Sequence, residues 1–337
     1  MQVQTGGRLL GQGVYGCTFE PAPRCAGGSV FKTIGGLPAV GKIVSDDAAE
    51  ELKVGKAIMA LPLATAYFAL PSEECKPEIP IQDEEASSCR VTTEAGAFTQ
   101  FSMLVMPSGG QPLIKFAANL ERLATNYLRV FVHLLEGGII YQNAGYVHND
   151  IHMGNVLVDD KNVARYIDFG LAFQLKDVKV WEDANLGTRF KPKYMMQPPE
   201  IHCWRMMLGG LRLADGVKEL KDMNSEYGRL EHQFPQRAQC LAAMMDLFKT
   251  DAAVRSKDGG AFVQEFGKRF DSWRLGFCMW LLWDDLLQWA PFMDSSVYGQ
   301  RTLVRTVLGG LTDFDPRRRL TFTAALALLD PGNRLAI

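Results

Sequence analysis

The chain has 337 residues, which is enough for about two domains of ordinary size. Hydrophobic residues make up 47% and charged residues 22%, and 36 basic against 38 acidic side chains leave a net charge of −2. This composition excludes a disordered tail and a generic nucleic-acid binder. The longest apolar run, residues 275–283, is half of the ~18 residues that a membrane span needs. The polar residues 1–8 lack the apolar core of a signal peptide. We therefore expect a soluble, intracellular protein with no membrane segment.

The seven cysteines are scattered, with no C-x-x-C pair and an odd total. This pattern disfavours a zinc site and a disulfide framework, and it predicts reduced thiols that are buried as small apolar side chains. Cys75 and Cys89 flank an acidic stretch, and a bridge between them stays open.

The first hundred residues are rich in Gly, Pro and short β-like runs, whereas the chain from Leu113 onward has helical apolar spacing. A turn-type cluster at residues 107–110 directly follows an apolar run at 101–106. The sequence therefore predicts a β-rich N-terminal domain at 1–106 and a helical C-terminal domain at 107–337.

Residues 11–16 fit the pattern G-x-G-x-x-G. A dinucleotide-binding turn would need a helix to begin at the third glycine. Residues 17–20 favour a strand instead, and Pro21 and Pro23 follow. We expect a hairpin tip that places backbone N–H groups over phosphates.

A second glycine pattern, residues 36–42, fits G-x-x-x-x-G-K. Ile43 occupies the position where a P-loop needs a hydroxyl for Mg²⁺, so residues 40–44 are better interpreted as a strand that carries Lys42 inward. A helix should follow the cap-forming residues 45–47. On that helix Glu51 shares a face with Val54, whereas Glu50 points about 100° away.

A half-buried helix is predicted at residues 126–142, ending near 143–145. After it come Asp150, Asn155 five residues later, and Asp168, which is followed by Phe169 and Gly170. An aspartate that accepts a hydroxyl proton, next to two oxygen donors for Mg²⁺, is typical of phosphoryl transfer.

These motifs together resemble the protein kinases of the serine/threonine type, over nearly the whole chain. Further matches are residues 198–200, residues 271–276 at the expected start of an apolar helix, and residues 315–319. Finer details at residues 13–21, 51–55 and 106–110 are most similar to kinases of large nucleocytoplasmic DNA viruses.

The resemblance implies an α+β, bilobal, protein-kinase-like fold, with a small β-rich N-lobe and a larger α-helical C-lobe. It implies ATP and Mg²⁺ as cofactors, with Asp150 as the base and Lys42 between the α- and β-phosphates, paired with Glu51. Asn155 and Asp168 would be the Mg²⁺ ligands. The residues implied to contact the nucleotide are Leu10, Gly11, Gly13, Gly16, Thr18, Lys42 and, at the hinge, Met106. The resemblance also implies that Glu200 pairs with Arg319.

Two residues depart from the family pattern. Asn149 replaces the arginine that usually precedes the catalytic aspartate, so activity is expected not to depend on phosphorylation of the activation loop. His152 stands where a lysine is usual. Together with Gly154 and Asn155, it makes this loop similar to the corresponding loop of aminoglycoside phosphotransferases. Two alternatives therefore stay open, namely a small-molecule (aminoglycoside- or choline-type) phosphotransferase and a nucleotide-binding pseudokinase scaffold.

The distance from Glu200 to Asp271 is longer than the family needs, which predicts an insertion within about 205–267. Extra helices or a partner-docking element could occupy it. We expect protein substrates, viral or of the host, and no direct contact with nucleic acid or membrane. If the protein is viral, its expected location is the host-cell cytoplasm, and packaging in the virion stays open.

Overall fold

The computed structural model describes residues 7–12, 16–44, 49–78, 88–89, 101–177, 196–208, 210, 212–215, 237–256 and 258–336. Gly13, residues 45–47 and the middle of the expected insertion, 216–236, lie outside these ranges. The chain forms two compact units. The N-terminal unit comprises Met1–Gly110 and Leu157–Gly170, and the C-terminal unit comprises Gln111–Val156 and Leu171–Ile337. Asp168 thus belongs to the N-terminal unit, whereas Asp150 and Asn155 belong to the C-terminal unit.

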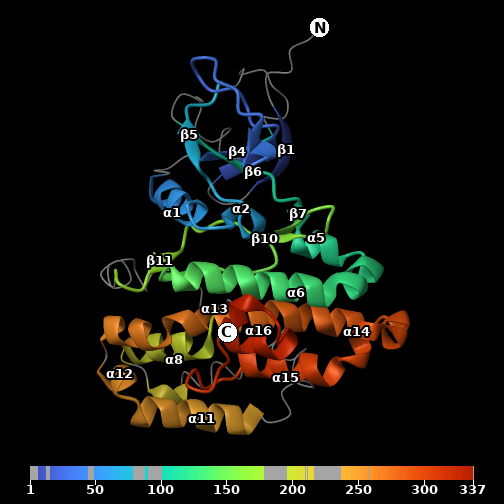
Figure 1. Cartoon of the computed structure of the whole chain (residues 1–337). Coiled ribbons are helices and arrows are strands. Elements are labelled where there is room, and N and C mark those ends of the chain that lie inside the picture. The colour runs from blue at the N-terminus through green and yellow to red at the C-terminus, as the bar shows by residue number, and fades with distance from the viewer. Residues whose placement is uncertain are drawn as a thin grey trace. The chain divides into compact units, whose positions relative to one another are not determined.

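The N-terminal unit is built on an antiparallel sheet, visible at the blue end of the chain (Figure 1). Its hydrogen-bonded order is β1 (Arg8–Gln12), β2 (Gly16–Glu20), β4 (Leu37–Val44), β6 (Ser102–Pro107) and β5 (Glu73–Cys75), and β3 (Thr33–Ile34) pairs with β4. Strands β1 and β2 pair antiparallel, as the predicted hairpin requires, and the strand around Lys42 is confirmed. The predicted hairpin tip at residues 13–15 lies outside the described residues. Gly16 is required for close approach, since a Cβ there would lie 2.3 Å from the Ile43 carbonyl oxygen.

Two helices and two further strands complete this unit. The helices are α1 (Ala49–Met59) and α2 (Ala64–Tyr67), and the strands are β9 (Val156–Val158) and β10 (Ala164–Tyr166). The Arg165 Nε donates to the Thr65 carbonyl oxygen at 2.9 Å, and Ala69 N donates to the Tyr166 carbonyl oxygen. These bonds hold the segment that ends in Asp168 against α2.

Four of the cysteines form disulfides, in contrast to the reduced thiols expected from the sequence. Cys17 bonds to Cys89 and Cys25 bonds to Cys75, so a Cys75–Cys89 bridge is also wrong. All four residues belong to one apolar cluster on the sheet. Partners that are 72 and 50 residues apart meet through the sheet register. Cysteine spacing alone could not reveal that pairing.

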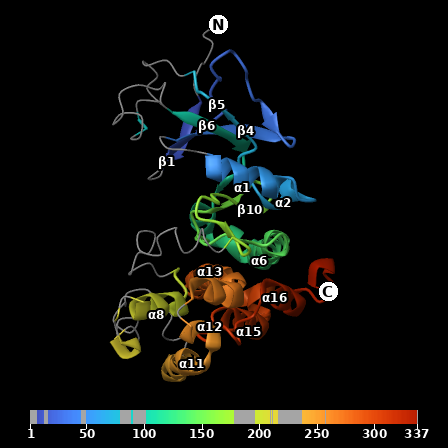
Figure 2. The same cartoon turned by 90° about the vertical axis from the view of Figure 1, so that its left-hand side faces the viewer.

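The C-terminal unit is helical. It contains β7 (Gln111–Pro112), α5 (Leu113–Ala117), α6 (Leu120–Asn143), β8 (Tyr146–Val147), β11 (Phe173–Gln174), α8 (Pro199–Leu208), α11 (Arg237–Thr250), α12 (Ala252–Arg255), α13 (Gly259–Leu287), α14 (Ser296–Gly299), α15 (Arg301–Leu311), α16 (Phe322–Leu329) and short 3-10 helices at Ala290–Asp294 and Arg334–Ala336. α16 packs on α6, and α15 packs on both α13 and α16. Within this unit α11 lies on the side away from α6 in both views (Figures 1 and 2).

Helix α13 is the core of the C-terminal unit and begins earlier than predicted. Residues 271–276 were expected to open it, but it starts at Gly259, where Asp258 caps the N–H groups of Gly260 and Ala261. The apolar face therefore extends backward through Phe262 and Phe266, which are both buried. As a result, Asp271 lies in the middle of a buried helix instead of at its exposed end, and the end of the expected insertion belongs to α13.

Helix α6 was predicted at residues 126–142 and also begins earlier, at Leu120. The Asn119 side chain caps it by accepting from Arg122 N at 2.9 Å. Its end, near residues 143–145, is as predicted. Among the described residues, no helix is both long and apolar enough to span a membrane.

Candidate functional site

Lys42 is the centre of a charged cluster in the N-terminal unit. It lies on β4 opposite Thr18 on β2 and Leu104 on β6. Its Nζ donates to the two carboxylate oxygens of Glu51 at 2.8 and 3.0 Å, and the Asp168 Oδ1 is 3.7 Å away. The Lys42 and Glu51 side chains are each 15% exposed. A strand, the helix that follows it and a segment more than 100 residues later thus place one cation between two carboxylates.

The charges of this cluster shift each other's pKa. Burial alone would lower the pKa of Lys42, but the negative charges of Asp168 and Glu51 outweigh it and hold that pKa above its usual value. Burial raises the pKa of Glu51, and Lys42 offsets only part of this effect. Lys42 is therefore a cation at neutral pH, which is the state that a phosphate-binding lysine needs.

The helix spacing distinguished the two neighbouring glutamates correctly. Glu50 points away to solvent, with its side chain 80% exposed, and contacts Lys53 at 3.3 Å. Glu51 points to the sheet and Lys42. The predicted contact is confirmed, whereas the catalytic role of the pair stays a prediction.

The residues predicted to contact the nucleotide line one part of the sheet. Leu10 on β1 packs on a cluster that contains Val40 and Met106. Gly11, Gly16 and Thr18 lie on the adjoining strands β1 and β2. Their contact with a nucleotide stays a prediction.

The loop between β8 and β9 carries Asp150 and Asn155. Asn155 is buried, and its amide Nδ2 donates to the carbonyl oxygen of Asp150 at 2.9 Å and to its Oδ2 at 3.1 Å. With Nδ2 used in this way, the Asn155 Oδ1 is the side-chain atom that could coordinate a cation. The loop therefore holds a carboxylate and an amide oxygen in a fixed relation.

Two histidines flank Asp150. His148 is fully buried, and its Nδ1 accepts from Asp150 N at 3.3 Å, as expected for a residue that supports the loop. The His152 Nδ1 accepts from Gly154 N at 3.0 Å, and its Nε2 is 3.8 Å from the Asp150 Oδ2. This hydrogen bond places the proton of neutral His152 on Nε2, facing the carboxylate.

Asp271 on α13 holds this loop, a role that the sequence analysis missed. Its Oδ2 accepts from His148 N at 2.7 Å and from the Tyr141 hydroxyl at 3.0 Å, and its Oδ1 accepts from Asn149 N at 2.9 Å. Asp271 is fully buried. The available signal was a carboxylate inside a strongly apolar segment, because a buried charge needs several hydrogen-bond partners.

Glu200 and Arg319 form a fully buried ion pair. The two guanidinium nitrogens Nη1 and Nη2 donate to the two carboxylate oxygens at 2.7 and 2.8 Å. The guanidinium also lies over the Trp273 ring, 5.1 Å from its centroid. The contact implied by the resemblance is present, and it fixes the start of α8 to the segment before α16.

Cys278 lies on α13 close to the Asp150 loop. Burial, followed by the charge of Asp150, raises the pKa of its thiol to about 12. The thiol is therefore protonated at neutral pH and is not a nucleophile.

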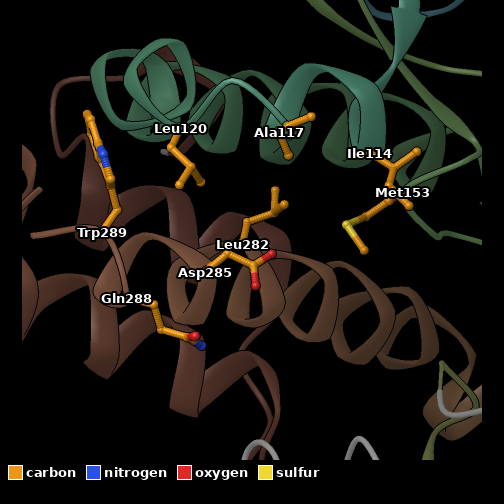
Figure 3. Close-up of a pocket in the computed structure, with 9 residues that line it drawn as sticks. Ile114, Ala117, Leu120, Met153, Leu282, Asp285, Gln288 and Trp289 are labelled. Atoms are coloured by element: carbon orange, nitrogen blue, oxygen red, sulfur yellow. The ribbon is translucent and has the colours of Figure 1, made fainter.

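A cavity of about 560 Å³ opens beside the same loop within the C-terminal unit. Its walls are mainly apolar, with one carboxylate, and include Ile114, Leu120, Met153, Leu282, Asp285 and Trp289. Figure 3 shows Leu120 and Ile114 extending from one side, Leu282 and Asp285 from α13 on the other, and Met153 and Trp289 at opposite ends. Met153 is three residues past Asp150, so the cavity adjoins the candidate catalytic loop.

The described residues contain no group of three or more His, Cys, Asp or Glu side chains that could hold a metal ion. The predicted ligands are two oxygen donors, Asn155 and Asp168, and they lie in different units. Their convergence on one ion stays a prediction.

Comparison with known proteins gives a partial similarity to a kinase. The chain is 33% identical over 118 residues to cyclin-dependent kinase 12 of Caenorhabditis elegans. The match covers 30% of this chain, and the chain spans only 15% of the length of that relative. No family model matches the chain. The similarity supports the kinase superfamily at most, and it contains nothing that indicates a viral origin.

Proposed function

We propose that the chain is a kinase that transfers the γ-phosphate of ATP, with Mg²⁺, to serine or threonine hydroxyls of proteins. The observation that carries this proposal is the convergence of Lys42, Glu51 and Asp168 in the N-terminal unit. A lysine held between carboxylates binds phosphate as a localised charge. The partial similarity to a kinase supports kinase activity in general.

The residues fit the proposed cofactors. An amide oxygen from Asn155 and a carboxylate from Asp168 are hard oxygen donors, which Mg²⁺ prefers, and Mg²⁺ commonly takes only one or two protein ligands together with phosphates. Bound Mg²⁺ would neutralise charge on the phosphates. Asp150 would orient the acceptor hydroxyl and take its proton. Its carboxylate is held by the Asn155 side chain, and the preceding residue, Asn149, is held through its backbone N–H by Asp271.

A protein substrate is favoured over a small alcohol by one feature of the C-terminal unit. The buried Glu200–Arg319 pair fixes α8, which in the resembling family belongs to a platform for polypeptides. The viral subgroup and the host location rest only on the short motifs at residues 13–21, 51–55 and 106–110, and docking through residues 205–267 rests only on the length and composition of the insertion. They are proposed on that basis.

The test is transfer of labelled phosphate by the full chain with Mg²⁺ and ATP. The acceptors are peptides containing serine, threonine or tyrosine, and a panel of aminoglycosides and choline-like alcohols. Asp150→Asn should lower kcat by about 10²–10⁴-fold, the usual contribution of a general base, with little change in ATP affinity. Asp160→Asn removes an equal but exposed charge ten residues further along the chain and is the control.

Three outcomes would change the proposal. Wild-type turnover in Asp150→Asn would remove the assigned base. Labelling of small alcohols alone would replace the protein substrate. Stabilisation by Mg²⁺ and ATP with no transfer at all would identify a nucleotide-binding scaffold.

A further inference from the structure

Arg274 is a buried, charged residue that has no role in the reaction proposed above. It lies on α13 between Trp273 and Leu275, and it is 1% exposed. Burying a guanidinium costs several kcal/mol unless it is paired and hydrogen-bonded. The contacts of Arg274 therefore indicate which role this buried charge has.

The guanidinium connects three parts of the C-terminal unit. Its Nη2 donates to the Asn149 Oδ1 at 2.9 Å and to the Gln197 Oε1 at 3.3 Å. Its Nη1 lies 3.6 Å from the Asp271 Oδ1. Arg274 therefore joins the loop of Asp150, the segment that enters α8, and the aspartate that holds the loop.

Asn149, the residue before Asp150, has an unusual backbone. Its φ is 64°, in the left-handed region that asparagine tolerates better than most residues. Its N–H donates to Asp271 at 2.9 Å, its Nδ2 donates to the Leu171 carbonyl oxygen at 3.4 Å, and its Oδ1 accepts from Arg274. The direction in which the chain enters Asp150 is thus fixed through the side chain of Asn149.

We propose that Arg274 is a positioning residue for Asp150, acting through Asn149 and linking the catalytic loop to the start of α8 through Gln197. The sequence has no arginine directly before Asp150. Arg274 supplies a buried cation to that loop from α13, and it does so without a phosphorylated residue. This inference rests on the proposed kinase activity.

The first experiment compares Arg274→Met and Arg274→Lys in the full chain. Methionine keeps the bulk and removes the donors, and we expect kcat to fall about 100-fold, the cost of a misplacement of about 1 Å. Lysine keeps the charge, but its compact ammonium group cannot reach all the partners of the planar guanidinium. We therefore expect a smaller loss of kcat, about tenfold. KM for ATP should not change in either variant. Lysine is the informative variant if methionine prevents folding.

The matched control is Trp280→Phe, which removes another buried hydrogen bond of α13, the 3.1 Å bond to the Thr312 Oγ1. It should lower the Tm without lowering kcat. If Arg274 only filled space, methionine would be tolerated better than lysine, and the two variants would lower the Tm and leave kcat unchanged, as the control does. That result would overturn the proposal.

A double-mutant cycle tests the path through Asn149. Asn149→Gly keeps the left-handed backbone and removes the Arg274 contact. The loss of kcat caused by Arg274→Met should largely disappear in this background, and additive losses would contradict the proposal. Should the wild type transfer no phosphate, the kinase assignment fails. The cycle is then measured as shifts in Tm, and additive shifts would refute the contact itself.

Phosphatase treatment should leave kcat unchanged, and a loss of activity would refute the independence from phosphorylation.

Discussion

The two units hold their charged residues by different means. In the C-terminal unit, Asp271, Arg274, Glu200 and Arg319 are almost fully buried and are fixed by hydrogen bonds around one long helix. In the N-terminal unit, Lys42 and Glu51 keep 15% of their side-chain surface exposed, and two disulfides cross a small sheet core. A large core can bury paired charges, whereas a small one depends more on covalent links.

The largest effect on stability is expected from the buried pair of the C-terminal unit. Glu200→Gln leaves the Arg319 guanidinium buried without its counter-charge, which typically costs about 3–5 kcal/mol. Hydrogen exchange measured by mass spectrometry should show faster exchange in α8 and α13, with the N-terminal sheet unchanged. Arg318→Gln is the control because its pair with Asp313 is more exposed. Equal effects of both variants would show that burial does not make the Glu200–Arg319 pair the more important one, and faster exchange in the N-terminal sheet would contradict the distinction between the units.

The next effect concerns activity and the N-terminal unit. Lys42→Met removes the cation between Glu51 and Asp168, and we expect kcat/KM to fall about 10²–10³-fold, as for loss of one preorganised electrostatic donor. Lys53→Met, on the exposed face of α1, is the control. Phosphate transfer should be measured together with hydrogen exchange of α13, which should stay unchanged. Normal transfer by Lys42→Met would show that the cluster is only structural.

The disulfides should contribute stability to the N-terminal unit alone. Replacing Cys25 and Cys75 by serine removes a link between residues 50 apart, and such a link is typically worth about 2–4 kcal/mol. A dithiol reductant should loosen the N-terminal sheet of the wild type and leave α6 and α13 protected. A variant that lacks all four bridging cysteines is the control, since it should not respond. Loosening of the helical unit would show that the two units depend on each other.

The sequence predicted the parts of the site that depend on local pattern. The spacing of Asp150, Asn155 and Asp168, the strand at Lys42 and the helix face of Glu51 each follow from short-range rules. Contacts between distant segments could not be predicted in this way. The Asp271 bonds to residues 148 and 149, the Arg274 bond to Asn149 and the pairing of four cysteines all depend on register and packing. The early start of α13 was missed because residues 259–267 were assigned to an insertion.

The smallest expected effect is on the acid dependence of stability, and it concerns one hydrogen-bonded carboxylate in each unit. Burial would raise the pKa of Asp159 and of Asp315. Hydrogen bonds from Arg165 and Arg317, respectively, together with backbone N–H groups, outweigh this and hold both pKa values below the usual one. The stability they contribute is therefore present above pH ~4 and is lost as pH falls through the lowered pKa. Each contribution should be below about 1 kcal/mol because solvent screens partly exposed pairs. Asp159→Asn should flatten the acid dependence of hydrogen exchange in the N-terminal unit only, and Asp315→Asn in the C-terminal unit only. An acid dependence that stays unchanged after both substitutions would contradict the prediction.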